Sequence, residues 1–203
     1  MSTERRIARI KEVSGRRQPD LTVVMENIHD PHNVSAMLRT CDAAGIARVQ
    51  LVYSKEKFPE IGKKSSASAK KWVERRAFQS LDDCFATLRS EGFTIYATGI
   101  SKSAVSIYSV DMRQKVAIVF GNEHRGVSAE ATGKADGILS IPMFGMIESL
   151  NVSVACAVIL FEAVRQRMGA GMYNGTGLAE DEIRKVRERS KGERGRGRGL
   201  VVK

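Results

Sequence analysis

The sequence predicts an α/β fold with a mainly parallel sheet, and three observations support this prediction. Apolar, β-branched runs alternate with segments of helical periodicity along most of the chain. The 203 residues, 42% of them apolar, suffice for one compact domain with extensions. Neither a GxGxxG nor a Walker A sequence follows the first predicted strand, so a dinucleotide-binding form of this fold is not expected.

Each element is placed by its own local pattern. Runs rich in apolar and β-branched residues place the strands at residues 21–26, 49–53, 72–76, 94–98, 115–120 and 137–141. Helical spacing and capping residues place the helices at residues 3–14, 33–45, 80–92, 128–132 and 150–167. The polar, lysine-rich stretch 55–70 is predicted to be a mobile loop with a turn of helix.

Residues that begin and end helices support these limits. Asn33 can cap the second helix, and Gly45 is of the residue type that ends helices. The i, i+3, i+4, i+7 spacing on this helix predicts a core-facing side made of Val34, Met37, Leu38 and Cys41. Ser80 opens the next helix in a capping-box-like sequence, that helix ends near Gly92, and Pro142 ends the last strand.

The final predicted helix has apolar residues on almost every side, namely Val152, Val154, Ala155, Val158, Ile159, Phe161 and Val164. A helix that is apolar all round is buried, either in the core or against another subunit. In so small a protein, a dimer interface is therefore a serious candidate.

The charge is strongly positive and unevenly distributed. The formal net charge is +10, and the basic residues gather in residues 5–17, 63–71 and 184–203. This distribution favours a polyanionic partner over the alternative of a solvated surface with a basic tail. No apolar run approaches the roughly 20 residues that a membrane span needs, and the basic start has no secretory h-region.

The cysteines give a further indication of the compartment. Cys41, Cys84 and Cys156 are odd in number, far apart and part of no CxxC motif. Neither a disulfide framework nor a structural zinc site is therefore predicted, and a reducing cytoplasm is the expected location.

Composition divides the chain into three parts. A basic extension over residues 1–20 precedes a domain over residues 21–170, and a charged extension occupies residues 171–203. Within the last part, residues 180–189 are predicted to form a charged helix and residues 190–203 to be disordered. The Arg-Gly end fits an inert solubilising tail and a loose contact with an RNA backbone equally well.

Three polar segments each follow an apolar predicted strand. They are residues 27–39 (NIHDPHNVSAMLR), 121–126 (GNEHRG) and 141–153 (IPMFGMIESLNVS). Because loops at the carboxyl ends of parallel strands build the ligand site in open α/β sheets, the three segments are expected to meet.

Each polar residue also has a simpler structural interpretation. Arg39 lies opposite the apolar side of its helix, where it can pair with Asp42 as a solvated arginine. Asn33 can merely cap its helix, and Glu123 can merely close a glycine-flanked turn. Ser149 and Asn151 can merely cap the last helix. A surface loop, rather than a metal site, is expected for His29, Asp30 and His32.

Taken together, the three segments resemble the signature motifs of the TrmH-type branch of the SPOUT methyltransferases. Asn33 and Arg39 lie in the first motif (NVSAMLRT), Gly121-Asn122-Glu123 matches the second, and Ile141-Pro142-Met143 with residues 149–153 (SLNVS) matches the third. The resemblance extends over about residues 16–173. The stretch 17–22 (RQPDLT) is also similar to the branch members that methylate the D-loop guanosine at position 18 of transfer RNA.

The resemblance implies a fold, a cofactor and partners. It implies an α/β sheet with a deep trefoil knot in its C-terminal part, assembled as an obligate homodimer. S-adenosyl-L-methionine would lie bent in the knot and supply the methyl group without a metal. The implied reaction is 2′-O-methylation of a guanosine ribose, and transfer RNA is the implied RNA partner.

The resemblance also implies roles for individual residues. The expected catalytic residues are Arg39, Asn33, Glu123, Ser149 and Asn151. The expected cofactor contacts are Thr98, Gly99, Gly121, Ile141, Met143, Leu150 and Ser153. The expected RNA contacts are Arg6, Arg9, Arg17, His32, Arg165 and Arg167.

The chemistry of Arg39 leaves two possibilities open. A guanidinium has a pKa above about 12 and seldom gives up its proton. Arg39 can therefore act as the base, or it can stabilise the developing alkoxide while phosphate or water takes the proton.

Two alternatives to a transfer-RNA enzyme remain from the sequence. Ribosomal-RNA members of this family often carry a separate RNA-binding domain ahead of the catalytic one, whereas about 20 residues precede the first strand here. A non-catalytic RNA-binding protein that kept the fold is the other alternative. The complete set of expected catalytic residues argues against it.

Overall fold

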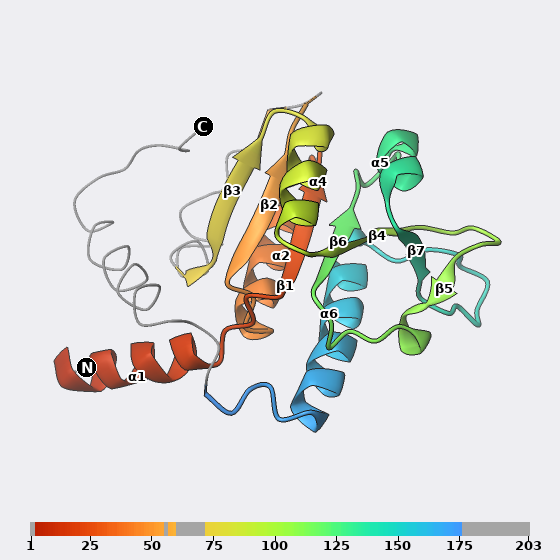
Figure 1. Cartoon of the computed structure of the whole chain (residues 1–203). Coiled ribbons are helices and arrows are strands. Elements are labelled where there is room, and N and C mark those ends of the chain that lie inside the picture. The colour runs from red at the N-terminus through yellow and green to blue at the C-terminus, as the bar shows by residue number, and fades with distance from the viewer. Residues whose placement is uncertain (1–2, 55–56, 60–71, 176–203) are drawn as a thin grey trace.

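A parallel sheet of seven strands forms the centre of the protein (Figure 1). The structure is a computed structural model that describes residues 3–54, 57–59 and 72–175. The strand order is β3-β2-β1-β6-β4-β7-β5, and every neighbouring pair is parallel. The predicted α/β class is therefore confirmed.

The elements alternate along the chain much as predicted. The strands are β1 (Leu21–Glu26), β2 (Arg48–Val52), β3 (Glu74–Phe78), β4 (Thr94–Thr98), β5 (Val105–Ser106), β6 (Val116–Phe120) and β7 (Gly137–Ser140). The helices are α1 (Thr3–Gly15), α2 (Pro31–Ala43), α4 (Leu81–Ser90), η1 (Ile107–Ser109), α5 (Ala129–Lys134) and α6 (Val152–Gly169).

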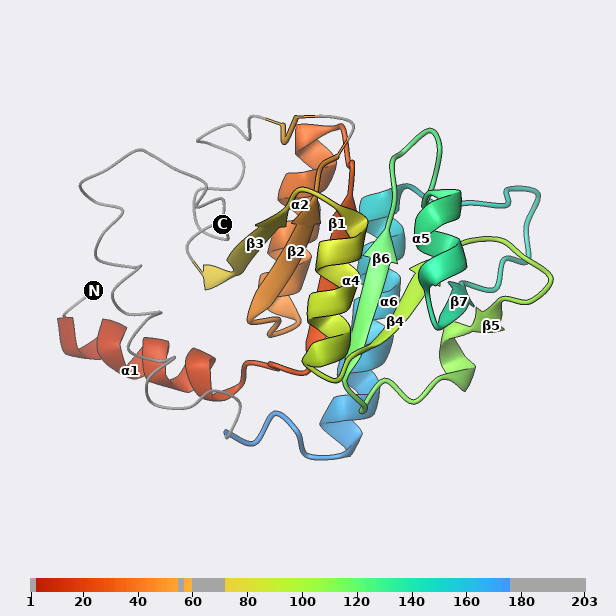
Figure 2. The ribbon, with the colours of Figure 1, turned by 45° about the horizontal axis from the view of Figure 1, so that its top comes forward.

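Helices cover both faces of the sheet. Figures 1 and 2 show α2 and α6 on one face and α4 and α5 on the other. Successive side chains of a strand point to opposite faces, so β1 contributes Val23 and Met25 to the core under α2 and α6, and Val24 to the other core. The core-facing side predicted for α2 is confirmed, because Val34, Met37, Leu38 and Cys41 are all buried.

Several predicted limits differ from the structure. The second helix begins at Pro31 and is capped by Asp30, not by Asn33. Proline suits the first helical position, where its missing N–H costs nothing, and the Asp30 carboxylate accepts from the backbone N–H of His32 at 2.8 Å. Strand β3 lies two residues later than predicted, and the two-residue strand β5 is too short to give an alternating pattern.

The final helix α6 is covered on one side only. Cys156, Ile159, Leu160 and Ala163 are buried in the core beside α2. Val154, Phe161 and Met168 are exposed along the opposite side. Within one chain the core therefore covers one side of this helix, and burial of the other side against a second subunit stays a prediction.

The ends of the described chain return to the domain. The Gln18 side chain donates to the backbone oxygen of Met172 at 3.0 Å, and the Tyr173 hydroxyl donates to the backbone oxygen of Ala44 at 2.8 Å. Across the described residues, no helix is both long and apolar enough to cross a membrane. The helix and disorder expected within residues 180–203 and most of the loop expected at 55–70 lie outside the described residues.

Candidate functional site

The three polar segments meet where β1, β6 and β7 end. Strands β1 and β6 are neighbours, and β4 joins β6 to β7, so the loops after these parallel strands leave the sheet at one edge. Side chains from all three loops are connected by hydrogen bonds. The expectation that the segments converge is confirmed.

Glu123 holds the first loop to the second. Its Oε2 atom accepts from the backbone N–H of His29 at 3.0 Å, and its Oε1 atom accepts from the backbone N–H of Asp30 at 3.0 Å. Oε1 also accepts from the side-chain amide of Asn33 at 2.9 Å. Glu123 therefore fixes the start of α2, rather than merely closing its own turn.

Asn33 extends these contacts to the third segment. Its Oδ1 atom accepts from the Asn151 amide at 3.1 Å, so the buried Asn33 side chain is used as a donor and as an acceptor. Asn151 is the N-cap of α6, and its own Oδ1 accepts from the backbone N–H of Ser153 at 2.9 Å and from the Ser153 hydroxyl at 2.6 Å. One continuous chain of polar contacts thus runs from Glu123 to Ser153.

The electrostatics of Glu123 follow from these contacts. Burial alone would raise the pKa of Glu123, but hydrogen bonds from the Asn33 amide and from the backbone of His29 and Asp30 hold the pKa below its usual value. The carboxylate is therefore ionised at neutral pH and serves as an acceptor, not as an acid.

The turn after β6 requires glycine at its first position. A Cβ atom at Gly121 would lie 2.1 Å from the backbone oxygen of Gly126, which is closer than any real contact. The next residue, Asn122, is buried and donates to the backbone oxygen of Asn27 at 2.9 Å. Asn27 and Asn122 therefore join the first two loops in a second place.

Arg39 is exposed on α2, six residues beyond Asn33. The pairing with Asp42 that the sequence allowed does not occur, because the Asp42 carboxylate accepts from Arg17 at 2.5 Å. In the part of the chain that the structure describes, Arg39 has no hydrogen-bond or ion-pair partner. Its guanidinium is thus free to meet a ligand, although it does not touch the contacts that join the three loops.

The residues expected to contact the cofactor lie in loops after adjacent strands. Thr98 is the last residue of β4 and Gly99 follows it, between the loops that begin at Gly121 and Ile141. Leu150 and Ser153 flank the cap of α6. Between Met143 and Leu150 the loop exposes Phe144, Met146 and Ile147, while Ser149 is also exposed.

Two of the expected RNA contacts, Arg17 and Arg167, lie inside the protein. Only 2% of the Arg17 side chain and none of the Arg167 side chain is exposed. Arg17 is bonded to Asp42 and to the backbone oxygen of Ile46, and Arg167 lies in a network of five hydrogen bonds. Both guanidinium groups therefore bind partners inside the protein, and a contact of either with RNA stays a prediction. Arg6 is half-buried, and Arg9, His32 and Arg165 are exposed.

Three residues of this region were missed or given no role from the sequence. Asp30 caps α2, Asn27 accepts from Asn122, and Glu26 accepts from the backbone N–H of Ser128 at 3.0 Å. The pair Asp30-Pro31 was a usable signal, because aspartate before proline is typical of a helix start. Asn27 has a φ of 50°, which asparagine tolerates better than most residues, but no local pattern announces it.

Comparisons with a family model and with characterised relatives identify the same kind of protein. A family model described as the SpoU rRNA methylase family matches residues 20–161. The tRNA (guanosine(18)-2′-O)-methyltransferase of Thermus thermophilus is 49% identical over 184 residues, which cover 91% of this chain and 94% of that protein.

Solved structures agree with this likeness. The A. aeolicus TrmH/SpoU tRNA modifying enzyme is similar with a TM-score of 0.87 and 37% identity, over 98% of each chain. The SpoU methyltransferase AviRb from Streptomyces viridochromogenes, solved in complex with the cofactor AdoMet, is similar with a TM-score of 0.66 and 26% identity. That similarity covers 75% of this chain and 62% of AviRb.

Proposed function

Because the chain belongs to the SpoU rRNA methylase family, we propose that it methylates the ribose 2′-hydroxyl of guanosine 18 in transfer RNA. The observation that carries this proposal is the hydrogen-bonded assembly of Glu123, Asn33 and Asn151, which joins the three motifs at one edge of the sheet. Two relatives support the proposal. The matched region covers 94% and 87% of their length, and both are named tRNA (guanosine(18)-2′-O)-methyltransferase.

We propose S-adenosyl-L-methionine as the methyl donor, as in the AviRb complex. The residues at the loops fit such a ligand. Gly121 keeps its turn free of a side chain, and Thr98, Gly99, Ile141, Met143, Leu150 and Ser153 surround the ends of the same strands. Apolar side chains and backbone groups suit a largely uncharged adenosine. When bound, the cofactor supplies a sulfonium-activated methyl group.

In this proposal, Arg39 acts at the ribose hydroxyl. It is exposed and unpaired within the described chain, on the helix whose first turn is fixed by Glu123. Its guanidinium would orient the nucleotide and either accept the hydroxyl proton or stabilise the alkoxide. Asn33, Glu123 and Asn151 are positioning residues, since their polar atoms bind one another, and Ser149 remains free to meet the substrate.

We also propose a homodimer and a C-terminal trefoil knot, in keeping with the resemblance to SPOUT enzymes. The exposed side of α6, with Val154, Phe161 and Met168, supports the dimer because such apolar stripes usually meet a partner. Membership of the SpoU family is the support for the knot.

The test is methylation of unmodified transfer RNA with labelled S-adenosyl-L-methionine, followed by mapping of the labelled nucleotide. We expect label on the ribose of guanosine 18, and none on a transcript that carries 2′-deoxyguanosine there. Ribosomal RNA is the competing substrate in the same assay. Label on ribosomal RNA alone would reject the transfer-RNA assignment, and no label on either would reject the enzyme.

A further inference from the structure

Asp42 is the only acidic residue of α2, and it stands three residues after Arg39. Residues three or four apart are neighbours on the surface of a helix, so an ion pair between Arg39 and Asp42 is the contact expected of this helix alone. The other neighbours of Arg39 at this spacing, Ser35, Ala36 and Ala43, carry no charge. Asp42 is therefore the one group of α2 that can take the Arg39 guanidinium away from a substrate.

A second arginine, Arg17, binds Asp42 instead. Its Nη2 atom donates to Oδ1 of Asp42 at 2.5 Å, and its Nη1 atom donates to the backbone oxygen of Ile46 at 2.8 Å. Arg17 is buried and already fixed by this backbone oxygen, so it loses little further freedom when it binds the carboxylate. The exposed Arg39 would have to give up its side-chain rotamers for the same contact. Arg17 therefore holds Asp42, and Arg39 has no partner among the described residues.

The turn that Arg17 contacts is closed without it. The backbone N–H of Ile46 donates to the backbone oxygen of Cys41 at 2.9 Å. The backbone N–H of Gln18 donates to the backbone oxygen of Gly45 at 2.8 Å, which attaches the segment that carries Arg17. Because a buried ion pair is often no more stabilising than apolar residues of similar volume, closing this turn does not account for a buried charge at Arg17.

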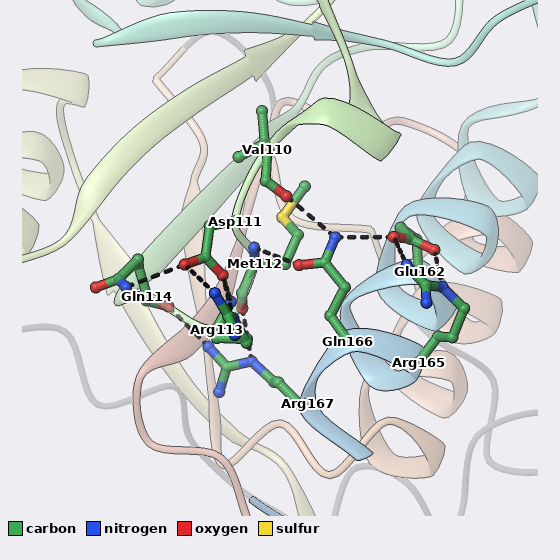
Figure 3. A network of polar contacts seen from close by, with 9 residues as sticks. All are labelled: Val110, Asp111, Met112, Arg113, Gln114, Glu162, Arg165, Gln166 and Arg167. Carbon is green, nitrogen blue, oxygen red and sulfur yellow. Dashed lines mark hydrogen bonds and ion pairs between the residues drawn. The ribbon is translucent and has the colours of Figure 1, made fainter. Parts of the chain in front are cut away.

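Arg167, the other buried arginine of the described chain, has a different pattern of contacts. Figure 3 shows it beside Met112 and Gln114, whose backbone oxygens accept from its Nε and Nη2 atoms at 2.8 Å each. Its Nη1 atom bonds the Asp20 carboxylate. These contacts join α6 to the segments that precede β6 and β1, which is a stabilising role. The printed contacts of Arg17, in contrast, all lie in the one turn at the end of α2.

We infer that Arg17 is a positioning residue that holds the Asp42 carboxylate away from Arg39, so that the Arg39 guanidinium stays available to the substrate RNA. The inference rests on the proposed role of Arg39 in methyl transfer, and it makes Arg17 act through Asp42. Without Arg17, the Asp42 charge would be uncompensated three residues from Arg39. It would then pair with Arg39 and repel a phosphate that approaches this side of the helix.

The experiment compares Arg17→Met with the double variant Arg17→Met/Asp42→Asn, both in the full chain. The double variant removes both charges, so it leaves no unpaired charge behind. We expect Arg17→Met to lower the single-turnover rate at saturating transfer RNA about 2- to 5-fold, the size of an exposed ion pair. Asp42→Asn in that background should recover the rate that was lost, and the salt dependence of transfer-RNA binding should not change.

The Arg76–Glu91 ion pair supplies the matched control. Arg76 of β3 bonds Glu91 at the end of α4 at 2.8 Å, on the other side of the sheet from α2. Arg76→Met and Arg76→Met/Glu91→Gln should both keep the native single-turnover rate. If Arg17→Met does not fold, Arg17→Gln takes its place, since its amide can still donate to the backbone oxygen of Ile46.

A second measurement needs no methyl transfer. Phenylglyoxal modifies free guanidinium groups faster than paired ones, and peptide mapping gives the rate at Arg39 in the absence of RNA. Arg17→Met should slow the modification of Arg39 about 2- to 5-fold. The double variant should restore it, and Arg17→Lys, which keeps a positive charge for Asp42, should stay close to the native rate.

The outcomes separate this inference from the proposed function. Equal modification of Arg39 in the native protein, the single variant and the double variant, with thermal melts showing that all three fold, would overturn the inference. A rate loss that persists in the double variant, with the log–log salt dependence of binding reduced by roughly 0.7 to 0.9, would identify Arg17 as a direct phosphate contact and also overturn it. Failure of the native protein to methylate transfer RNA, with the expected modification pattern retained, would reject only the proposed function.

Discussion

Arg39 is exposed on α2, while the nearest carboxylate along its helix, Asp42, is bonded to Arg17. An arginine with no partner within the described chain contributes little to stability, so its removal isolates its chemical role. We expect Arg39→Ala to lower turnover at least roughly 100-fold, because a group acting on the hydroxyl is lost. Stability should change by less than about 1 kcal/mol.

A lysine at the same position refines this prediction. Arg39→Lys keeps the positive charge but loses the planar fork that holds a phosphate through two donors. Single-turnover methylation by the lysine variant should be nearly as slow as by the alanine variant, while cofactor binding by calorimetry stays intact. Near-normal turnover in Arg39→Ala would remove this residue from the catalytic set.

Glu123 gives a prediction about pH. Burial raises the pKa of Glu123, but hydrogen bonds from Asn33, His29 and Asp30 lower it by more than burial raises it. The folded-state pKa therefore lies below the unfolded-state pKa. Its contribution to stability is fully present above the unfolded-state pKa of about 4.3 and is lost as the pH falls through the folded-state pKa. Glu123→Gln should therefore cost about 1 kcal/mol of unfolding free energy at pH 7.

Urea unfolding at several pH values measures this cost. The difference between the native protein and Glu123→Gln should shrink as the pH falls below about 4, since both side chains are then neutral. A difference that stays constant with pH would show that the ionised carboxylate is not what the loop contacts require.

At the scale of elements, α6 carries two arginines that differ in burial, since 71% of the Arg165 side chain and none of the Arg167 side chain is exposed. Arg167→Met removes five hydrogen bonds and leaves the Asp20 carboxylate without its partner, so a loss of about 3 to 5 kcal/mol is expected. Arg165→Met, on the same helix, should cost less, because it removes two hydrogen bonds and the Glu162 carboxylate keeps the Gln166 amide as a donor. Equal urea midpoints for the two variants would contradict this assignment.

These elements also show what the sequence predicts well and what it does not. Strands such as β1 and β4 were predicted at their observed limits. A run of apolar and β-branched residues indicates a strand from its own composition, whatever segments later pack against it. The burial of Arg17 and Arg167 was not predictable, since charge is a property of the residue and burial depends on segments far along the chain. The N-cap of α2 was missed by three residues, because it was assigned to Asn33 instead of Asp30.

The candidate site was predicted as a set of residues but not as a geometry. Asn33 and Glu123 are 90 positions apart, so no local spacing indicates that the Asn33 amide donates to that carboxylate. Family resemblance supplied the members of the set. The structure supplied their connections, and it separated the residues that bind one another from Arg39, which binds none of them.

At the scale of the whole molecule, the exposed side of α6 predicts assembly. Phe161→Asp places a charge in the middle of the apolar stripe and should convert a dimer into a monomer in sedimentation. Phe161 is a cleaner probe than Val158, which also packs against the core. Ala86→Asp, on the exposed side of α4, is the matched control and should remain dimeric. A native protein that sediments as a monomer at micromolar concentration would contradict the dimer.

The purely parallel sheet also has a consequence for how the protein is made. Strand β1 lies between β2 and β6, so its second edge stays unpaired until residues 116–120 leave the ribosome. At about 5 to 20 residues per second, the 90 positions between Asn33 and Glu123 take roughly 5 to 20 s to translate. During that time the start of α2 lacks the carboxylate that holds it. The site is therefore among the last parts of the nascent chain to form, and truncated translation products should be targets for chaperones and proteases rather than partly active enzymes.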